Sequence, residues 1–456
     1  MTKARDLANI ISGGFTADDI PNLDTAKLTT GTIASARINN DSLSAITALP
    51  SGVGGIALQS VQTTGFTAVA GRGYPCDTTL AAFTVTLPAT PSAGDQVQLV
   101  DYAGTFDTNQ LIINPNGEDL EGSALNLALT GEREGIILTY IDSTQGWIAT
   151  SGINEGTDAL SPVAYSVDFL VIAGGGGAGG NGTDNTAAGG GGAGGYRNSF
   201  SNESSGGGGS SEASLSFLPG VVYTITVGAG GAGGGTAVDS NAGVGTVGLN
   251  SEISGTGITT ITSTGGGGGA CSGGQATGSA TSGGSGGGCN QYKTSQGSGT
   301  ANQGFAGAKA TGDGGGGGGG GASQTPTANS TNDGGVGGNG LASSITGSSV
   351  SRGGGGGGGN YGASGGTGGT GGGGNANTPT AAGSAGTVNT GGGGGAGRSN
   401  TGASYTGGAG GKGVVILRMP DGNYSSTTTG SPTVNTNVGG SGETVIIFND
   451  SGSITG

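Results

Sequence analysis

The stretch DFLVIAGGGGAGG at residues 168–180 joins a strand-like pattern directly to a run of glycine. Its five apolar residues, Phe169 to Ala173, pass without a turn signal into a segment that has almost no side chains. The stretch GGAGGKGVVILRMP at 407–420 reverses this order and leads from glycine back into an apolar run. We therefore predict that the two apolar runs pair as strands and hold the glycine-rich chain between them.

Glycine is concentrated in the chain between these two strands. It makes up 116 of the 456 residues, and 91 of these lie in the 247 residues from 174 to 420. The longest runs are separated by inserts of Ser, Thr, Asn and Ala; they span 174–177, 189–192, 206–209, 265–269, 314–321, 353–359, 371–374 and 391–395. Composition of this kind is typical of flexible linkers. A collagen triple helix is excluded, because it needs glycine at every third position with abundant proline, and the chain has only 12 Pro.

A third interpretation is a bundle of extended polyglycine helices, each with three residues per turn as in polyproline II. Glycine keeps the backbone N–H that proline lacks, so neighbouring helices can form lateral hydrogen bonds. It also lacks Cβ, so backbones can approach closely on every side. Because ordering glycine is entropically costly, the bundle requires almost complete pairing of interior backbone groups and an apolar anchor. The flanking strands supply that anchor, so the sequence favours an ordered bundle over a linker.

The whole chain is predicted to be all-β. Residues 55–152 predict a small knob of β-sandwich type, because segments such as LAAFTVTLP, QVQLVDY and GIILTYI are separated by turn signals such as NPNGED. The single Trp, Trp147, is expected in the core of this knob. Residues 1–54 have apolar side chains at short intervals, and form either a narrow stalk intertwined with copies of itself or a flexible leader. The remaining parts are a linker at 153–164, the glycine-rich domain at 165–420 and a C-terminal β segment at 421–456.

Acidic charge belongs to the N-terminal part of the chain. Residues 1–173 carry 18 acids and 6 bases, whereas residues 174–420 carry 7 of each. This distribution argues against nucleic-acid binding by either part. The acids near predicted turns of the knob could hold Ca²⁺, but no twelve-residue calcium loop is present, and a solvated rim is favoured. These acids are Glu118, Asp119, Glu121, Glu132 and Glu134.

The sequence predicts no enzyme, no cofactor and no metal site. Histidine is absent, which removes the commonest general base and the commonest metal ligand. The cysteines Cys76, Cys271 and Cys289 show no C-x-x-C spacing. Cys271 and Cys289 either pair or, as a reducing cytosol favours, remain two inert thiols. The sequence shows no signal-peptide pattern and no apolar run of membrane-spanning length, so we expect no membrane insertion.

Recognition is the remaining class of function, because a scaffold that needs few side chains leaves its connecting inserts free to vary. Tyr, Asn, Ser and Gly are typical of adaptable binding surfaces. Four inserts combine aromatic residues with Arg, Asn, Gln or Lys. The candidate binding residues in them are Tyr196, Arg197, Phe200, Asn290, Gln291, Tyr292, Lys293, Asn360, Tyr361, Arg398, Asn400 and Tyr405. For each of them, the alternative is a side chain that only covers the end of the bundle.

The ordered strand motifs resemble the glycine-rich domains of bacteriophage tail fibres and adhesins. These motifs are DFLVIAGGGGAGG, YTITVGAGG, SEISGTGITTITSTGGGGG and GKGVVILR. The leader IPNLDTAKLTTGTIASARI resembles segments near the start of tail-fibre proteins, including those of marine and cyanobacterial phages. The last 34 residues, which begin at NYSSTTTG, resemble the short segment that often follows such domains. The knob resembles tail-fibre domains only weakly.

The resemblance implies a virion protein, made in the host cytoplasm, that forms a homotrimer with a trimeric N-terminal stalk. Its N-terminus would attach to the phage tail or baseplate. In adhesins of T-even phages the distal loops of the polyglycine bundle choose the receptor, so the candidate residues above are expected to bind a host surface glycan or an outer-membrane protein. The alternative function is a structural decoration or spacer protein of the virion without a receptor role. The clustered Tyr, Arg and Asn inserts speak against that alternative.

Overall fold

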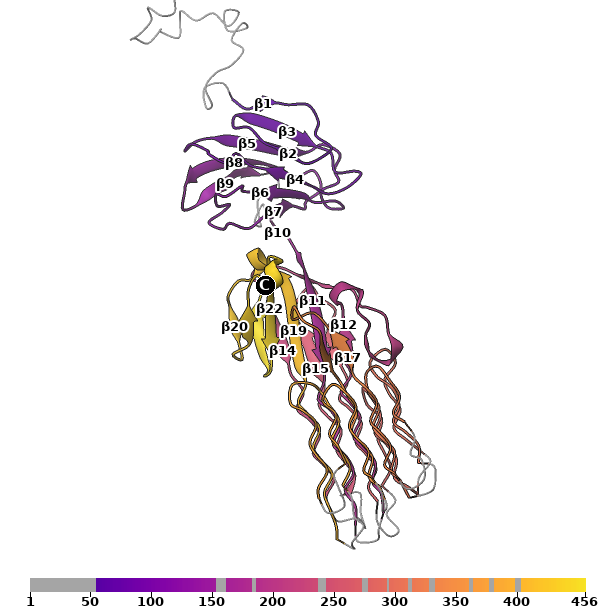
Figure 1. Cartoon of the computed structure of the whole chain (residues 1–456). Coiled ribbons are helices and arrows are strands. Elements are labelled where there is room, and N and C mark those ends of the chain that lie inside the picture. The colour runs from indigo at the N-terminus through magenta and orange to yellow at the C-terminus, as the bar shows by residue number, and fades with distance from the viewer. Residues whose placement is uncertain are drawn as a thin grey trace, which may run out of the picture. The chain divides into compact units, whose positions relative to one another are not determined.

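The computed structural model describes residues 55–152, 161–182, 186–236, 243–272, 278–292, 295–310, 314–327, 333–360, 364–376, 381–397 and 403–456. These residues form an all-β protein, as predicted, and none of the described ranges contains an α-helix. The chain divides into two compact bodies, of which the first ends at Ser161 and the second begins at Pro162 (Figure 1). The predicted stalk over residues 1–54 lies outside the described residues.

The first body is a pair of five-stranded sheets. One sheet has the order β1 (Ala57–Leu58), β3 (Arg72–Cys76), β5 (Gln96–Asp101), β8 (Gly135–Asp142) and β9 (Gly146–Gly152). The other has the order β10 (Ser161–Pro162), β7 (Leu127–Leu129), β6 (Leu111–Asn114), β4 (Phe83–Thr86) and β2 (Phe66–Thr67). Both are mixed sheets. In the first, β3 runs parallel to β5 while β8 runs antiparallel to it; in the second, β4 runs parallel to β6 while β7 runs antiparallel to it.

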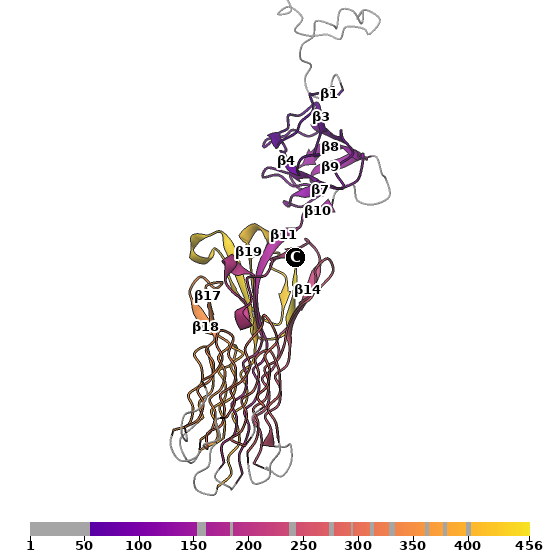
Figure 2. The same cartoon turned by 90° about the vertical axis from the view of Figure 1, so that its right-hand side faces the viewer.

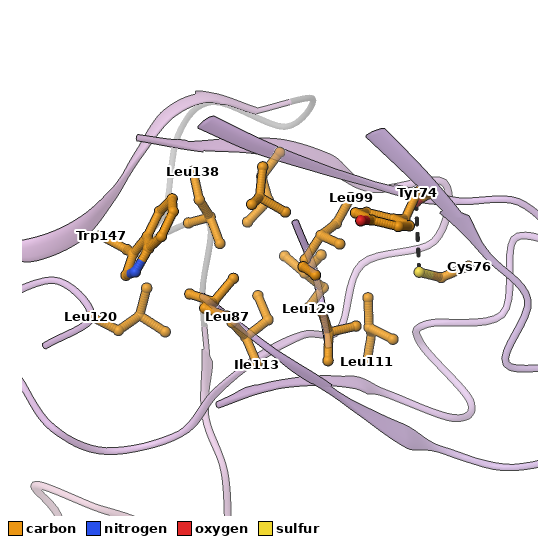
Figure 3. Close-up of a cluster of buried hydrophobic side chains, with 14 of the residues drawn as sticks. Tyr74, Cys76, Leu87, Leu99, Leu111, Ile113, Leu120, Leu129, Leu138 and Trp147 are labelled. Carbon is orange, nitrogen blue, oxygen red and sulfur yellow. Dashed lines mark hydrogen bonds between the residues drawn. The ribbon is translucent and has the colours of Figure 1, made fainter. Parts of the chain in front are cut away.

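Alternating apolar residues on these strands meet in one hydrophobic core (Figure 3). Trp147 is fully buried there, as predicted, and its ring meets Tyr140 edge-on with centroids 5.5 Å apart. On the other side of Figure 3, the thiol of Cys76 donates to the backbone oxygen of Tyr74 over 3.6 Å. The sandwich predicted for residues 55–152 is therefore formed around side chains from both sheets.

The second body begins with a β-sandwich. Its first sheet has the order β12 (Tyr196–Asn198), β11 (Tyr165–Ile172), β19 (Val414–Pro420), β22 (Glu443–Phe448) and β21 (Thr433–Asn435), and β13 (Leu215–Phe217) also pairs with β11. Its second sheet has the order β16 (Ile261–Ser263), β15 (Ser251–Ser254), β14 (Val222–Thr226), β23 (Gly452–Thr455) and β20 (Thr428–Thr429). The hairpin of β17 (Leu341–Ser343) and β18 (Val350–Arg352) forms a two-stranded sheet of its own. Short 3₁₀ turns lie at η5 (Phe200–Asn202), η6 (Gly206–Gly208), η8 (Asp421–Asn423) and η9 (Val438–Gly440).

The two apolar runs that bracket the glycine-rich chain pair with each other, which confirms the prediction. Strand β11 runs antiparallel to β19, with Phe169 opposite Leu417 and Ile172 opposite Val414. Both faces of this pair are buried: one packs against the second sheet, and the other packs beneath Ile345, which follows β17. Continuous apolar sequence is what a strand covered on both faces requires.

The C-terminal segment 421–456 lies within the second body. Strand β22 extends the first sheet beside β19, and β23 enters the second sheet beside β14. The last strands of the chain therefore contribute to both halves of the sandwich, and Phe448 and Ile454 lie in its core.

The glycine-rich segments run side by side away from this sandwich (Figures 1 and 2). Successive residues of the segment that follows β11 donate backbone hydrogen bonds to three different neighbours in turn. The first neighbour is the segment 243–249, which accepts from Gly174, Gly177 and Gly180. The second is the segment 408–411, which accepts from Gly175 and Ala178. The third is the segment 189–192, which accepts from Gly176 and Gly179; all seven bonds measure 2.8–3.0 Å. A donor direction that repeats every third residue means three residues per turn, the period of polyglycine and polyproline II helices.

The same segment accepts hydrogen bonds from three more neighbours. Its carbonyl groups at Gly174 and Gly177 accept from Gly266 and Gly269. Those at Gly175 and Ala178 accept from Gly231 and Gly234, and those at Gly176 and Gly179 accept from Gly394 and Gly397. One extended segment is thus surrounded by six others. We call this assembly of segments between residues 173 and 413 the glycine bundle.

Candidate functional site

The glycine bundle has interior and rim segments, and the residue pattern distinguishes them. Interior segments are buried at every described residue; they are 173–182, 186–195, 265–272, 283–290, 315–322, 353–360 and 391–397. Rim segments instead expose one side chain per turn, as Ser364, Thr367 and Thr370 do, with Gly366 and Gly369 buried between them. Most of the long glycine runs therefore lie inside, although 206–209 and 371–374 do not, and the short GGT repeat at 365–370 lies at the rim.

The end of the bundle away from the sandwich, which we call the distal end, is marked by asparagine. Asn181, Asn290 and Asn360 each end an interior segment that runs away from the sandwich, and each is fully buried. The Asn181 amide donates to the backbone oxygen of Thr186 over 3.3 Å, while its oxygen accepts from the backbone N–H of Tyr405 over 3.2 Å. The Asn181 side chain thus takes over the pairing of backbone groups where its glycine segment stops.

Tyr292 is the most exposed of the described candidate residues at this end, and its backbone is held in place. Its side chain is 61% exposed. The preceding Gln291 forms a reciprocal pair with Ala187, donating its N–H to the Ala187 oxygen over 3.2 Å and accepting the Ala187 N–H on its Oε1 over 3.1 Å. The Tyr292 N–H itself donates to Asn290 Oδ1 over 3.1 Å. A rigidly mounted, exposed aromatic ring can provide binding area at low entropic cost.

Two other candidates at the distal end have structural contacts. The Asn290 amide donates to the backbone oxygen of Cys271, which ties two interior segments together. Tyr405 forms antiparallel bridge contacts with Asn181 through its backbone. The side chain of Asn360 is buried, and neither its nitrogen nor its oxygen has a hydrogen-bond partner among the described residues.

The first candidate insert lies at the opposite end of the bundle, beside the sandwich. Tyr196 is fully buried in the cluster beneath the β17–β18 hairpin, so its side chain is not available to a ligand in this structure. Arg197 forms an ion pair with Glu212, and Phe200 packs under the guanidinium of Arg418, 4.8 Å from the ring centroid. The expectation that all four inserts lie in distal loops is therefore wrong for this one, because Tyr196 belongs to β12 and pairs with Ile172.

Four candidates, Lys293, Tyr361, Arg398 and Asn400, lie outside the described residues. Sequence reasoning missed Asn181, which has the same role as Asn290 in tying distal segments together. The signal was present: Asn181 and Asn360 directly follow glycine, as GGN at 179–181 and GGN at 358–360 show, and only Cys289 separates Asn290 from the run 286–288.

The thiols of the second body are buried and free. Cys271 and Cys289 form no disulfide, and burial raises the pKa of each thiol above its usual value. Cys289 Sγ accepts the N–H of Ala310 over 2.8 Å. The two residues thus behave as small core side chains, which is the second of the two alternatives that the sequence left open.

The acidic residues of the first body have mixed surroundings. Glu134 is buried rather than part of a solvated rim, and its Oε2 accepts from the N–H groups of Thr130 and Gly131 over 2.9 and 2.7 Å. Asp101 likewise accepts from the N–H groups of Gly104 and Arg133. Within the described ranges, no three His, Cys, Asp or Glu side chains gather as a metal site would require. No helix among these residues is long and apolar enough to cross a membrane.

A comparison with protein families agrees with this architecture. The family described as glycine-rich domain matches residues 153–420, which is more than half of the chain. The chain belongs to this glycine-rich domain family. The matched range covers the opening strand β11, the glycine bundle and the closing strand β19. A search of curated proteins found no match to the sequence.

Proposed function

We propose that this protein is a bacteriophage tail-fibre protein that binds a receptor on the host cell through the distal end of its glycine bundle. The observation that carries the proposal is the placement of Tyr292. An exposed aromatic side chain follows directly on an interior segment whose backbone is fixed by Asn290, Gln291 and Ala187. Such a combination supports recognition, because little conformational entropy is lost when the ring contacts a partner.

The resemblance of the strand motifs to tail fibres supports the rest of the proposal. The protein would be part of the virion, assembled as a homotrimer and attached to the tail or baseplate through its N-terminal residues. Its receptor would be a surface glycan or an outer-membrane protein of the host. The bundle would act as a rigid support, since its interior is held by backbone hydrogen bonds and needs few side chains.

Adsorption to cells tests this function. Fluorescently labelled full-length protein would be incubated with a panel of candidate bacteria, in parallel with Tyr292→Ala and Tyr102→Ala variants. Tyr102 is the matched control, because it is 57% exposed on the first body. We expect binding to at least one strain, a fall of roughly tenfold or more for Tyr292→Ala, as for a central aromatic contact, and no change for Tyr102→Ala.

Two results would contradict the proposal. Absence of binding to every strain by a folded protein would favour the decoration or spacer protein. Binding that both variants retain would show that Tyr292 does not take part in recognition.

A further inference from the structure

An open polar groove lies on the side of the second body, where the glycine bundle joins the sandwich. Its volume is about 540 Å³. Three pieces of chain that are distant in sequence line it, namely the loop 205–212, the turn 301–303 and the side chain of Arg197. It lies near β12 and so does not involve the distal residues discussed above.

The walls of the groove are fixed by close backbone packing. A Cβ on Gly206 would lie 2.1 Å from the backbone oxygen of Gln303, and a Cβ on Gly209 would lie 2.9 Å from Cβ of Asn302. Gly207 and Gly208 adopt φ values of +65° and +80°, which L side chains rarely adopt. Glycine is therefore required in this loop so that it can lie directly against the turn, and the groove between them is preformed.

The charged groups of the groove neutralise each other. Arg197 Nε donates to both carboxylate oxygens of Glu212 over 2.9 and 3.1 Å, and its Nη1 donates to the Thr262 oxygen over 3.2 Å. The Glu212 carboxylate also accepts from the Ser205 hydroxyl over 3.3 Å. A neutral lining of this kind does not select an anion or a cation.

The remaining polar side chains of the groove are positioned for hydroxyl groups. Ser210 and Asn302 are exposed, and Asn302, which adopts φ +58°, has its Cβ beside Gly209. Ser211 and Gln303 add a further hydroxyl and a further amide to the lining. Hydroxyls and amides are groups that bind sugars, which present many hydrogen-bond donors and acceptors.

Glu212 also lines a second, more apolar hollow of about 340 Å³. Leu215, Ile258 and Ile261 line this part.

We propose that this groove is a saccharide-binding site, separate from the distal end of the bundle. It goes beyond the proposed function and does not depend on it, because its ligand is a neutral sugar in solution rather than a cell. An extended peptide is the competing occupant, and the experiment below distinguishes the two.

Saturation-transfer difference NMR on the full chain tests the site. The probes are the methyl glycosides of glucose, galactose, mannose and N-acetylglucosamine, each alone, and tetra-alanine as the peptide. Ser210→Trp fills the groove, and Ser348→Trp places the same side chain at an exposed position elsewhere. Asn302→Gly removes the amide while keeping a backbone that glycine favours.

We expect saturation transfer to at least one glycoside, its loss in Ser210→Trp, and its retention in Ser348→Trp. Asn302→Gly should weaken binding by up to about tenfold, as expected for the loss of one hydrogen bond between the site and a sugar hydroxyl. Transfer to none of the glycosides, transfer to tetra-alanine alone, or transfer that survives in Ser210→Trp would overturn the proposal. A glycoside signal without adsorption to cells would support the groove and count against the proposed function, so the two failures are distinguishable.

Discussion

At the scale of single residues, the absence of Cβ decides whether the glycine bundle can form. A Cβ built on Gly174, Gly175, Gly176 or Gly177 would lie 1.9–2.1 Å from a backbone oxygen of a neighbouring segment. The neighbour is backbone in each case, so no side chain can turn aside to make room. Some interior alanines place their methyl groups against one another, as Ala178 does in a cluster with Ala188 and Ala396.

A single added methyl group inside the bundle is therefore predicted to be strongly destabilising. In Gly191→Ala the new Cβ would stand 2.2 Å from the Gly176 oxygen. We expect unfolding free energy to fall by about 3 kcal/mol, at the upper end of overpacking effects. Gly422→Ala is the matched control, because nothing lies within 4 Å of its Cβ position. Thermal unfolding measures both variants, and equal melting temperatures would contradict the packing argument.

The first body contains a residue whose titration links stability to alkaline pH. Burial, and next the negative charge of Asp101, raise the pKa of Cys76 from 9.0 to about 12. The thiol is neutral in the folded state and ionises more readily when the chain is unfolded. Its contribution to the free energy of unfolding is therefore complete below pH 9 and is lost as the pH rises to 12. Urea unfolding of the wild type and of Cys76→Ala between pH 8 and 12 measures the effect. The stability advantage of the wild type over Cys76→Ala should shrink over this range, and a constant difference would contradict the prediction.

At the scale of elements, strands β11 and β19 anchor the bundle, and the sequence predicts this pairing from its apolar runs. Their residues are buried on both faces of the sheet, which explains why the runs are continuous rather than alternating. The sequence does not predict which glycine runs enter the bundle. The run 206–209 instead forms the turn η6 in the groove, because Gly207 and Gly208 adopt positive φ, and composition carries no sign of that choice.

Loss of the anchor should unfold the bundle together with the sandwich. Phe169 is fully buried opposite Leu417, and Phe169→Ala is expected to lower the unfolding free energy of the second body by about 3–5 kcal/mol. Val222→Ala on β14 is the control, since Val222 is 56% exposed. Urea unfolding followed by circular dichroism measures the unfolding free energy of both variants. A Phe169→Ala protein with wild-type stability would mean that the bundle holds without its anchor.

At the scale of the whole molecule, the fold is more predictable than the candidate site. All-β class, the knob core around Trp147 and the bundle follow from patterns that span many residues. The site depends on which ends of segments meet, and this is set by the hydrogen-bond pairing between segments far apart in sequence. Tyr196 shows the difficulty: it follows a glycine run as Tyr361 does, yet it belongs to a strand of the sandwich and is buried.

The central claim is that the glycine-rich chain is an ordered, hydrogen-bonded bundle, and native-state hydrogen exchange tests it most directly. Mass spectrometry would follow exchange in peptides covering 174–181 and 353–360, with β11 as the internal reference. Interior backbone N–H groups are paired at 2.8–3.1 Å in these segments, so we predict protection comparable with that of β11. Exchange at the rate of a flexible linker, while β11 stays protected, would contradict the account.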